Sequence, residues 1–497
     1  MVFSLPWVAK AQGRLATAVP LIRAITGVGT SVALFIGWAP RGSDTAATRL
    51  TSFADYERHF GGLDPRSHLG YAVKQFYDNG GSDAYVVRIA GVGALPAAAA
   101  IGDLTIAGSS RGEWAHDYRV RLTTSADDSS RFRLDVLHAP SNDAVVESFE
   151  NLSMKPGDAR FVEDVVNERS ASIVTTATGL TRPASARVNL GAGTRGSDGT
   201  VIGPADADFL TALRKLLGVH AVTDGIDLFN IVCVPGLADP ATIASLQSEC
   251  GRRRAFLIVD APEGETMASM PAVATAMAGP AAMNSALYFP WIRAADPLSQ
   301  GAVRAFPPCG YVAGVYARTD ASRGVWESPS GRDAGLSGAL GLAVTISDQE
   351  NGQLHPLGIN CLRTLPVYGT VIWGARTLHG HNERASEWKY VPVRRLALFI
   401  EESLYRGTKW VVFEPNGEPL WAQIRLEVDA FMQNLFRQGA FKGTSAADAY
   451  FVRCDVTTTT QADIDRGIVN IHVGFAPVKP AEFVVFKLQQ FAGEIKT

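Results

Sequence analysis

The chain has 497 residues, of which 46% are hydrophobic and 19% charged, and its 46 basic and 49 acidic residues give a formal net charge of −3. A chain of this length exceeds the size at which one hydrophobic core keeps growing, so roughly two to four domains are expected. The basic residues are spread along the chain and form no stripe that could neutralise phosphates, so neither nucleic acid nor an anionic membrane is an expected partner.

The cysteines indicate a reducing compartment. The five of them stand far apart and form no CxxC pair: Cys233, Cys250, Cys309, Cys361 and Cys454. We interpret them as free thiols, because a chain this long needs no disulfide staples. No run of about 18 apolar residues occurs, so no transmembrane helix is predicted. We therefore expect the chain to be made and to fold in the cytosol, so that anything that takes it outside the cell acts afterwards.

The first 90 residues predict a strand, two helices and a second strand. SVALFIG (31–37) is a short apolar run bounded by Gly and Pro, typical of a buried strand. Ser52 and Ser67 precede two segments with helical spacing, and the second of these ends at Gly80. AYVVRIA (84–90) is the second strand.

The pattern changes between about residues 95 and 195. Apolar and polar residues alternate strictly in YRVRL (118–122) and RFRLDV (131–136), which predicts half-buried antiparallel strands. The stretch opens with LPAAAA and ends with the Gly-rich GAGTRGSDGT. We interpret it as an inserted β domain with flexible joints.

Strands and helices alternate between residues 205 and 355, which predicts a layered α/β domain with a largely parallel sheet. The strands are IDLFNIVCV (226–234), AFLIVD (255–260) and SALYF (285–289), and one helix begins at Asp239-Pro240. The Gly- and Ser-rich segment from about 310 to 360 is predicted to be mostly loop.

The C-terminal part has the most regular patterning. A helix is predicted from near Pro392 to Tyr405, a strand at WVVF (410–413), and a long amphipathic helix from Pro419 to about Arg437. Three further strands are predicted in the segments AYFVRC (449–454), GIVNIHVGFAP (467–477) and EFVVFKLQQF (482–491).

The sequence motifs that could indicate catalysis or the binding of a cofactor or metal are weak. Gly191, Gly193 and Gly196 match GxGxxG, but no helix is predicted after them to bind a phosphate. The histidines of HGH (379–381) have no Cys or acidic partner at a metal-ligand spacing. Asp260 ends an apolar strand, where α/β enzymes place carboxylates, although an Asp there also caps turns. The sequence therefore predicts no catalytic residue, no cofactor and no metal site.

Long stretches of the chain resemble contractile phage tail sheath proteins. They are ITGVGTSVALFIGWAPRG (25–42), TSFADYERHFGGLDPRSHLGYAVKQFYDNGGSDAYVVRI (51–89), GVYARTDASRGVWESPSG (314–331), LGINCLRTLPVYGTVIWGARTL (357–378), WKYVPVRRLALFIEESLYRGTKWVVFEPNGEPLW (388–421), NLFRQGAFKG (434–443), and the segment from FVRCD to EFVV (451–485). The resemblance covers nearly the whole chain. The N-terminal stretch departs from the usual pattern, because it lacks the PGVYVEE-like strand that sheath proteins carry before GVGTS.

The resemblance implies a multidomain protein of mixed α/β class. We expect an N-terminal arm (1–24), an α/β middle domain (25–94 with 202–355), an inserted antiparallel β domain (95–201) and an α+β C-terminal assembly domain (356–497).

The resemblance also implies a structural, non-enzymatic subunit that forms stacked hexameric rings around an inner tube and contracts to drive the tube through a target envelope. Its implied partners are other copies of itself, the inner tube protein, and baseplate and terminator or cap proteins. The particle would be a phage tail or a bacterial contractile injection device.

Two sets of residues are candidate contact sites. Apolar side chains on both faces of the last predicted strand suit donation of that strand to a neighbouring sheet: Phe483, Val484, Val485, Phe486 and Leu488. Pro477 and Pro480, which precede them, would act as a stiff spacer. Arg425, Arg437 and Lys442, on or just after the long helix, could face an acidic inner tube, or could simply be solvated.

Two alternatives stay open at this point. One is an α/β enzyme with a site at the strand ends near Asp260. The other is a cap or baseplate component of the same particle, which would form a closed ring instead of a long polymer.

Overall fold

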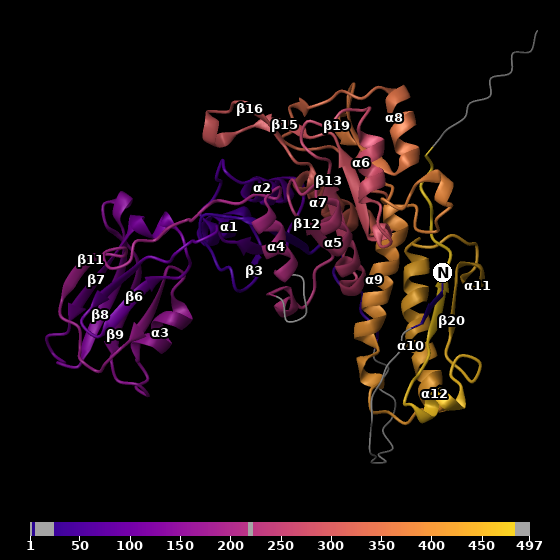
Figure 1. The fold of residues 1–497 in the computed structure, drawn as a ribbon. Helices are drawn as coiled ribbons and strands as arrows, with labels where there is room; N and C mark the ends of the chain where they lie inside the picture. Colours follow the sequence, from indigo (N-terminus) through magenta and orange to yellow (C-terminus); the bar gives the residue numbers. More distant parts are fainter. Residues whose placement is uncertain (1, 5–23, 217–221, 483–497) are drawn as a thin grey trace, which may run out of the picture. The chain divides into compact units, whose positions relative to one another are not determined.

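A computed structural model describes residues 2–4, 24–216 and 222–482. The chain divides into two compact units. The sheet unit comprises residues 28–323 and 329–399, and the C-terminal unit comprises residues 400–482 with segments 2–4, 24–27 and 324–328. Figure 1 shows both, coloured along the sequence.

The sheet unit is built on an eight-stranded sheet in the order β19-β18-β14-β13-β12-β2-β4-β3. The strands are β2 (Ala33–Trp38), β3 (Thr48–Leu50), β4 (Ala84–Ile89), β12 (Ile231–Cys233), β13 (Phe256–Asp260), β14 (Ser285–Phe289), β18 (Ile359–Leu365) and β19 (Gly369–Ile372). The six central strands are parallel, and the outer strands β3 and β19 are antiparallel to their neighbours. This confirms the predicted α/β class with a largely parallel sheet.

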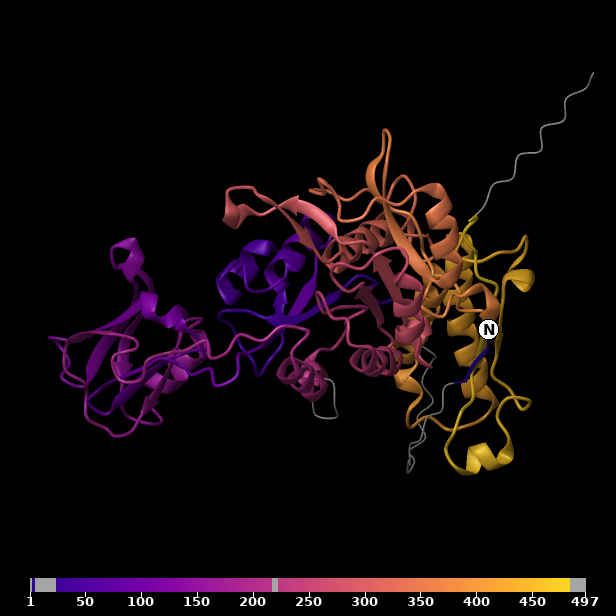
Figure 2. The same ribbon diagram turned by 45° about the horizontal axis from the view of Figure 1, so that its top comes forward.

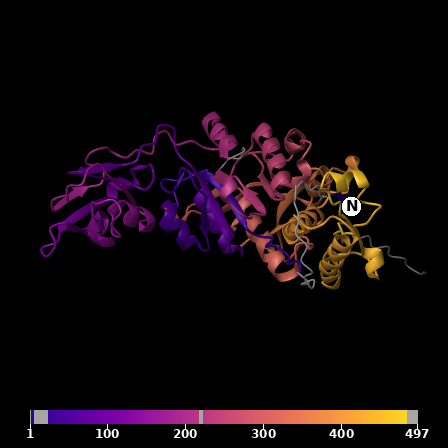
Figure 3. The same ribbon diagram turned by 90° about the horizontal axis from the view of Figure 1, so that it is seen from below.

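Helices cover both faces of this sheet. Successive side chains of a strand point to opposite faces, and in the central strands the side chains on both faces are apolar. Ala33 and Phe35 of β2 pack into one core with α1 (Phe53–Phe60), α2 (Leu69–Asp78) and α7 (Cys309–Arg323). Leu34 and Ile36 pack into a second core with α4 (Ala207–Leu216), α5 (Pro240–Arg253) and α6 (Met270–Met277). Figure 3 shows the indigo and magenta helices on opposite sides of the strands.

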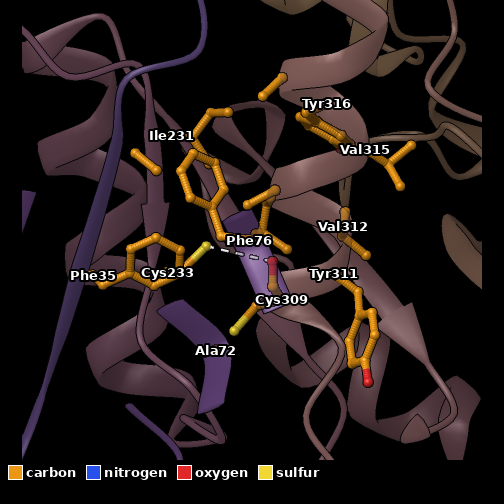
Figure 4. Packing of buried hydrophobic residues seen from close by; sticks show 14 of the residues in the cluster. Phe35, Ala72, Phe76, Ile231, Cys233, Cys309, Tyr311, Val312, Val315 and Tyr316 are labelled. Carbon is orange, nitrogen blue, oxygen red and sulfur yellow. Dashed lines mark hydrogen bonds between the residues drawn. The ribbon is translucent and has the colours of Figure 1, made fainter. Parts of the chain in front are cut away.

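The first core is closely packed where α2 meets α7 (Figure 4). Phe35 and Phe76 make an edge-to-face pair with ring centroids 5.5 Å apart. The Cys233 thiol donates a weak hydrogen bond of 3.7 Å to the carbonyl oxygen of Cys309, the first residue of α7. The prediction of loop between about 310 and 360 is wrong here, because α7 continues for 15 residues and its first nine are buried.

Residues 97–190 hold a hydrophobic core of their own. One sheet has the order β10-β6-β5 and the other β11-β7-β8-β9. The strands are β5 (Ala98–Ile101), β6 (Leu104–Gly108), β7 (Tyr118–Thr124), β8 (Arg131–His138), β9 (Ala144–Ser153), β10 (Ile173–Ala177) and β11 (Ala186–Asn189), and one helix, α3 (Val162–Arg169), packs with them. All these pairings are antiparallel, as the alternating pattern predicted.

The remaining strands of the sheet unit form a small sheet in the order β16-β15-β17: β15 (Ile292–Ala295), β16 (Val303–Phe306) and β17 (Gly341–Leu342). A further helix, α8 (Asp348–Leu354), begins with a capping box between Ser347 and Glu350. The helix α9 (Val391–Gly407) begins in the sheet unit and ends in the C-terminal unit.

The C-terminal unit contains α10 (Glu418–Arg437), α11 (Ala446–Ala449), α12 (Gln461–Asp465) and a three-stranded sheet in the order β1-β21-β20. Its strands are β1 (Val2–Ser4), β20 (Tyr450–Arg453) and β21 (His472–Phe475). The predicted strand at WVVF is wrong: Lys409–Val411 form a turn of 3-10 helix, and Phe413 follows with a φ of 79°. No helix in the described ranges has the length and apolarity to cross a membrane.

Candidate assembly sites

Asp260, the carboxylate on which an enzymatic function would depend, has a structural role. It ends β13, is 1% exposed, and accepts hydrogen bonds from the backbone N–H of Gly236 (2.9 Å) and of Cys309 (2.8 Å). Burial raises the pKa of this carboxyl to about 6, against the lowering effect of the two N–H donors. The side chain therefore ties the turn after β12 to the first turn of α7.

The crevice where an α/β sheet would bind a ligand is almost filled. β2 lies between β4 and β12 in the sheet: the chain first runs from β2 to β4 at one side and later returns from β4 to β12 at the other. Ligands of such sheets bind at the carboxyl ends of the strands at this switch point. The cavity there has a volume of about 40 Å³ and is lined by residues that include Trp38, His68 and Pro235. This is far below the roughly 300 Å³ or more of a small-molecule site.

The other candidate motifs are also used structurally. Gly193 N–H donates to the carbonyl of Ala98, and a Cβ at Gly196 would lie 2.4 Å from the carbonyl oxygen of Gly112, so the glycines allow close backbone packing. His379 bonds to Ser386 through Nδ1 (2.7 Å). Among residues 2–4, 24–216 and 222–482, no three His, Cys, Asp or Glu side chains gather in a way that could hold a metal ion.

Buried polar side chains connect segments that are far apart in the sequence. The Arg88 guanidinium donates to the carbonyls of Ala39 and Gly42, at 2.7 and 2.9 Å, and so holds the loop after β2. Asn79, at the end of α2, accepts from the N–H of Ser337 at 2.8 Å. Each contact joins a helix or strand end to a loop, which fixes the loop's path.

One of these contacts is a buried ion pair between α7 and α9. Arg395 donates to both carboxylate oxygens of Asp320, at 2.8 and 2.6 Å, and the two side chains are 3% and 2% exposed. Arg395 also donates to the carbonyl of Thr30 (2.9 Å) and lies over the ring of Tyr316. Sequence reasoning missed this pair, although an arginine among the apolar residues of VPVRRLALFI was a signal that it is paired inside the fold.

The terminal sheet brings the two ends of the described chain together. Residues Val2, Phe3 and Ser4 pair antiparallel with Gly474, Val473 and His472 of β21, in that order. β20 pairs with the other edge of β21, and it contacts α10. A strand from the N-terminal end therefore completes a sheet whose other strands come from the C-terminal segment.

The three basic residues suggested to face an inner tube, Arg425, Arg437 and Lys442, differ in their surroundings. The Arg425 guanidinium donates to the carbonyl of Cys454 and makes a 2.6 Å ion pair with Glu418. Arg437 is the last residue of α10 and Lys442 follows it by five positions, and both side chains are exposed. The candidates for strand donation, Phe483, Val484, Val485, Phe486 and Leu488, lie outside the described residues.

Comparison with known families gives two matches. The phage tail sheath protein central domain matches residues 206–378, and the phage tail sheath C-terminal domain matches residues 383–491. The chain is 26% identical over 290 residues to a prophage major tail sheath protein of Pseudomonas aeruginosa, a match that covers 56% of this chain and 70% of that protein. It is 30% identical over 181 residues to the tail sheath protein of Vibrio phage KVP40, a match that covers 36% of this chain and only 25% of that longer protein.

Solved structures share the fold over almost the whole chain. The contracted sheath complex of the extracellular contractile injection system PVC has a TM-score of 0.61 and 22% identity, covering 98% of this chain and 99% of that chain. The sheath tail protein of Listeria innocua has a TM-score of 0.64 and 14% identity, covering 93% and 94%. At these identities the likeness establishes the architecture.

Proposed function

This chain belongs to the phage tail sheath protein family, whose members are structural subunits of contractile tails and injection systems, and we propose that it polymerises as stacked hexameric rings around an inner tube. Contraction of the stack would drive the tube through a target envelope. Its partners would be further copies of itself, the tube protein, and baseplate and cap or terminator proteins. Assembly would take place in the prokaryotic cytoplasm, and the particle would be a phage tail or an injection device.

The terminal sheet is the observation that carries this proposal. Its third strand, β1, consists of only three residues supplied by the N-terminal end. Within the described part of the chain, β1 and β20 each pair with β21 alone, so their outer edges have no strand partner among these residues. An exposed edge accepts a strand from another chain by ordinary backbone hydrogen bonding. A terminal segment can therefore link two copies without a change in the core of either.

The segment from Phe483 to Leu488 is the proposed donor of such a link. About five paired residues would each add a net 0.5 to 1.5 kcal/mol from backbone hydrogen bonds. Burial of each large apolar side chain would add about 1.5 to 3 kcal/mol, and ordering the backbone would cost about 1 to 2 kcal/mol per residue. A single link is then modest, and a polymer is stable because it has many.

Truncation tests the strand link directly. Ending the chain after Pro480 should leave a folded monomer or small ring with native-like circular dichroism and no long tubes in negative-stain electron microscopy. Val485→Pro, which removes one backbone donor, should act in the same direction, whereas Val485→Thr keeps the donor and is the matched control. Tubes of normal length from the truncated protein would refute strand donation, and unfolding would place the strand in the subunit's own core.

We place the inner tube near Arg437 and Lys442, whose exposed charges suit an acidic partner surface. Charge reversal of both should weaken co-assembly with the tube protein, and more strongly at low salt than at high salt. Arg425→Glu should instead lower the stability of the C-terminal unit, because this side chain holds Cys454 and Glu418. Unchanged co-purification of the Arg437→Glu/Lys442→Glu protein would exclude this contact.

The inserted β domain, residues 95–201, is proposed to decorate the outside of the polymer. It has its own core, so its removal need not expose the eight-stranded sheet. Replacing it with a short Gly/Ser bridge should leave tube formation intact. Loss of tubes from a protein that still folds would mean that this domain contributes to the contacts between subunits.

A further inference from the structure

The turn between β18 and β19 carries an apolar tip that the fold of one subunit does not use. Val367 is 99% exposed and the neighbouring Tyr368 is 52% exposed. β19 is an edge strand of the large sheet, and Figure 2 shows the orange hairpin projecting from it. Val367 has a φ of 74°, a conformation that glycine adopts readily and a β-branched residue does not. A strained valine that buries nothing in its own subunit points to a role outside that subunit.

A pocket of complementary character lies elsewhere in the same unit. Its volume is about 70 Å³, which is room for several water molecules. Ala274 of α6 and Leu378 form its buried part, and Ala278 and Leu357 are half-buried beside them. The remaining lining residues are Pro271, Thr275, His381 and Arg384. An apolar floor with a polar border is the arrangement of an anchor site in a protein interface.

The tip and the pocket stand at opposite ends of one strand. Leu357 precedes β18 by two residues and Val367 follows it by two. The seven residues of β18 span about 23 Å at the usual rise per residue, so a subunit cannot place its own Val367 in its own pocket. A contact between them must join two copies head to tail. Such a heterologous contact repeats from copy to copy, and builds a ring if the rotation between copies closes or a helical filament if it does not.

We propose that Val367 of one subunit inserts into the pocket formed by Ala274, Ala278, Leu357 and Leu378 of a second copy of this chain. The isopropyl group displaces water from the apolar floor, and the ring of Tyr368 lies against the polar border, where the Arg384 guanidinium can stack on it. This contact rests on the proposed function, since it is one of the contacts that would hold neighbouring sheath subunits together. It is separate from the strand link of the terminal sheet.

Engineered cysteines test the contact. The double variant Val367→Cys/Ala278→Cys should form disulfide-linked dimers and a ladder of higher oligomers on mild oxidation, and each single variant should form neither a ladder nor trimers. The five native cysteines are buried and should not contribute. Because disulfide formation needs Cα atoms within about 7 Å, a ladder reports this contact specifically. Oxidised protein at high concentration that shows no ladder would overturn the proposal.

Substitution at the tip tests its contribution to assembly. Val367→Asp should raise the critical concentration for tube formation by about tenfold or more, while the melting temperature of the subunit does not fall. Val367→Gly should weaken assembly as well but should stabilise the free subunit, since glycine removes the strain. Leu340→Asp, at another exposed apolar position of the same unit, is the control.

The two proposals can fail separately. If the unmodified protein forms no tubes with or without the tube protein, the proposed function fails. If the unmodified protein forms tubes and the Val367 variants form them equally well, the head-to-tail contact is wrong.

Discussion

The ion pair between Asp320 and Arg395 allows a quantitative test of what holds the sheet unit together. Asp320→Ala removes the carboxylate and leaves the Arg395 guanidinium buried with one carbonyl acceptor, that of Thr30, and the ring of Tyr316. Removing one partner of a buried pair costs about 3 to 5 kcal/mol, since the remaining charge loses its counter-ion without regaining water. Asp320→Ala should therefore strongly destabilise this unit.

The expected change in melting temperature follows from the size of the unit. The sheet unit has about 370 residues. At about 2.1 cal/mol/K per residue, a loss of 3 to 5 kcal/mol lowers the melting temperature by roughly 4 to 6 °C. Thermal unfolding of the unassembled subunit, followed by circular dichroism, measures this shift.

An exposed ion pair in the same unit is the matched control. Lys74 and Asp78 lie one turn apart on α2, with side chains 37% and 46% exposed. Asp78→Ala should cost only about 0.2 to 0.5 kcal/mol, a shift below about 1 °C. The combined variant Asp320→Leu/Arg395→Met should recover most of the lost stability, since apolar residues can replace a buried pair. If Asp320→Ala melts within about 1 °C of the unmodified protein, this pair does not stabilise the unit.

Three further predictions concern buried positions. Gly314→Ala should destabilise it by about 1 to 3 kcal/mol in urea unfolding, because the added Cβ would lie 2.6 Å from the carbonyl oxygen of Phe76, whereas Gly352→Ala, with open space around it, should be neutral or slightly stabilising. Burial raises the pKa of Asp260 from 3.8 to about 6, so its contribution to stability is full below the unfolded pKa and is lost as the pH rises through the folded pKa. The free energy of unfolding from urea titrations should therefore fall by about 3 kcal/mol between about pH 4 and 6.5, and Asp260→Asn should not show this fall. None of the five buried cysteines should react with Ellman's reagent in the native protein, and all five should react in urea, because the fold excludes the reagent from buried thiols and burial also raises the pKa of the Cys361 thiol to about 12. A flat midpoint across that pH range, or rapid reaction of a native thiol, would contradict the buried environments described.

The sequence predicted the central sheet well because its strands are short apolar runs between clear turn signals. FLIVD and SALYF are strands as predicted, and Asp239 caps α5 as predicted. The helix α7 was missed because Gly310 and Gly314 resemble loop residues. In the fold they are the reason that α7 can approach α2: a Cβ at Gly310 would lie 2.4 Å from the carbonyl oxygen of Ala72. Local propensity cannot reveal a requirement that comes from another helix.

The strand predicted at WVVF failed for a related reason. Four apolar residues in a row suit a strand, but Val411 and Phe413 lie in a turn between α9 and α10, with Phe413 exposed.

For the candidate contact residues, the sequence shows whether a side chain is charged or apolar, but it does not show which groups surround that side chain. Arg425 and Arg437 look alike on a helical pattern, yet only the three-dimensional structure shows the Arg425 guanidinium at the carbonyl of Cys454.

The terminal sheet and the buried ion pair differ in how much free energy is needed to separate them. This difference predicts which contacts could change when a polymer of such subunits rearranges. The three residues of β1 gain about 0.5 to 1.5 kcal/mol each in backbone hydrogen bonds and cost about 1 to 2 kcal/mol each in ordering, so β1 contributes little to the stability of its own unit. The pair between Asp320 and Arg395 cannot open without a charge left in the core. A polymer built from such subunits would therefore rearrange at its strand links and apolar tips while each sheet unit moves as a rigid body. The proposed contraction requires this order of strengths, because links that were stronger than the fold would unfold the subunits before the rings could slide.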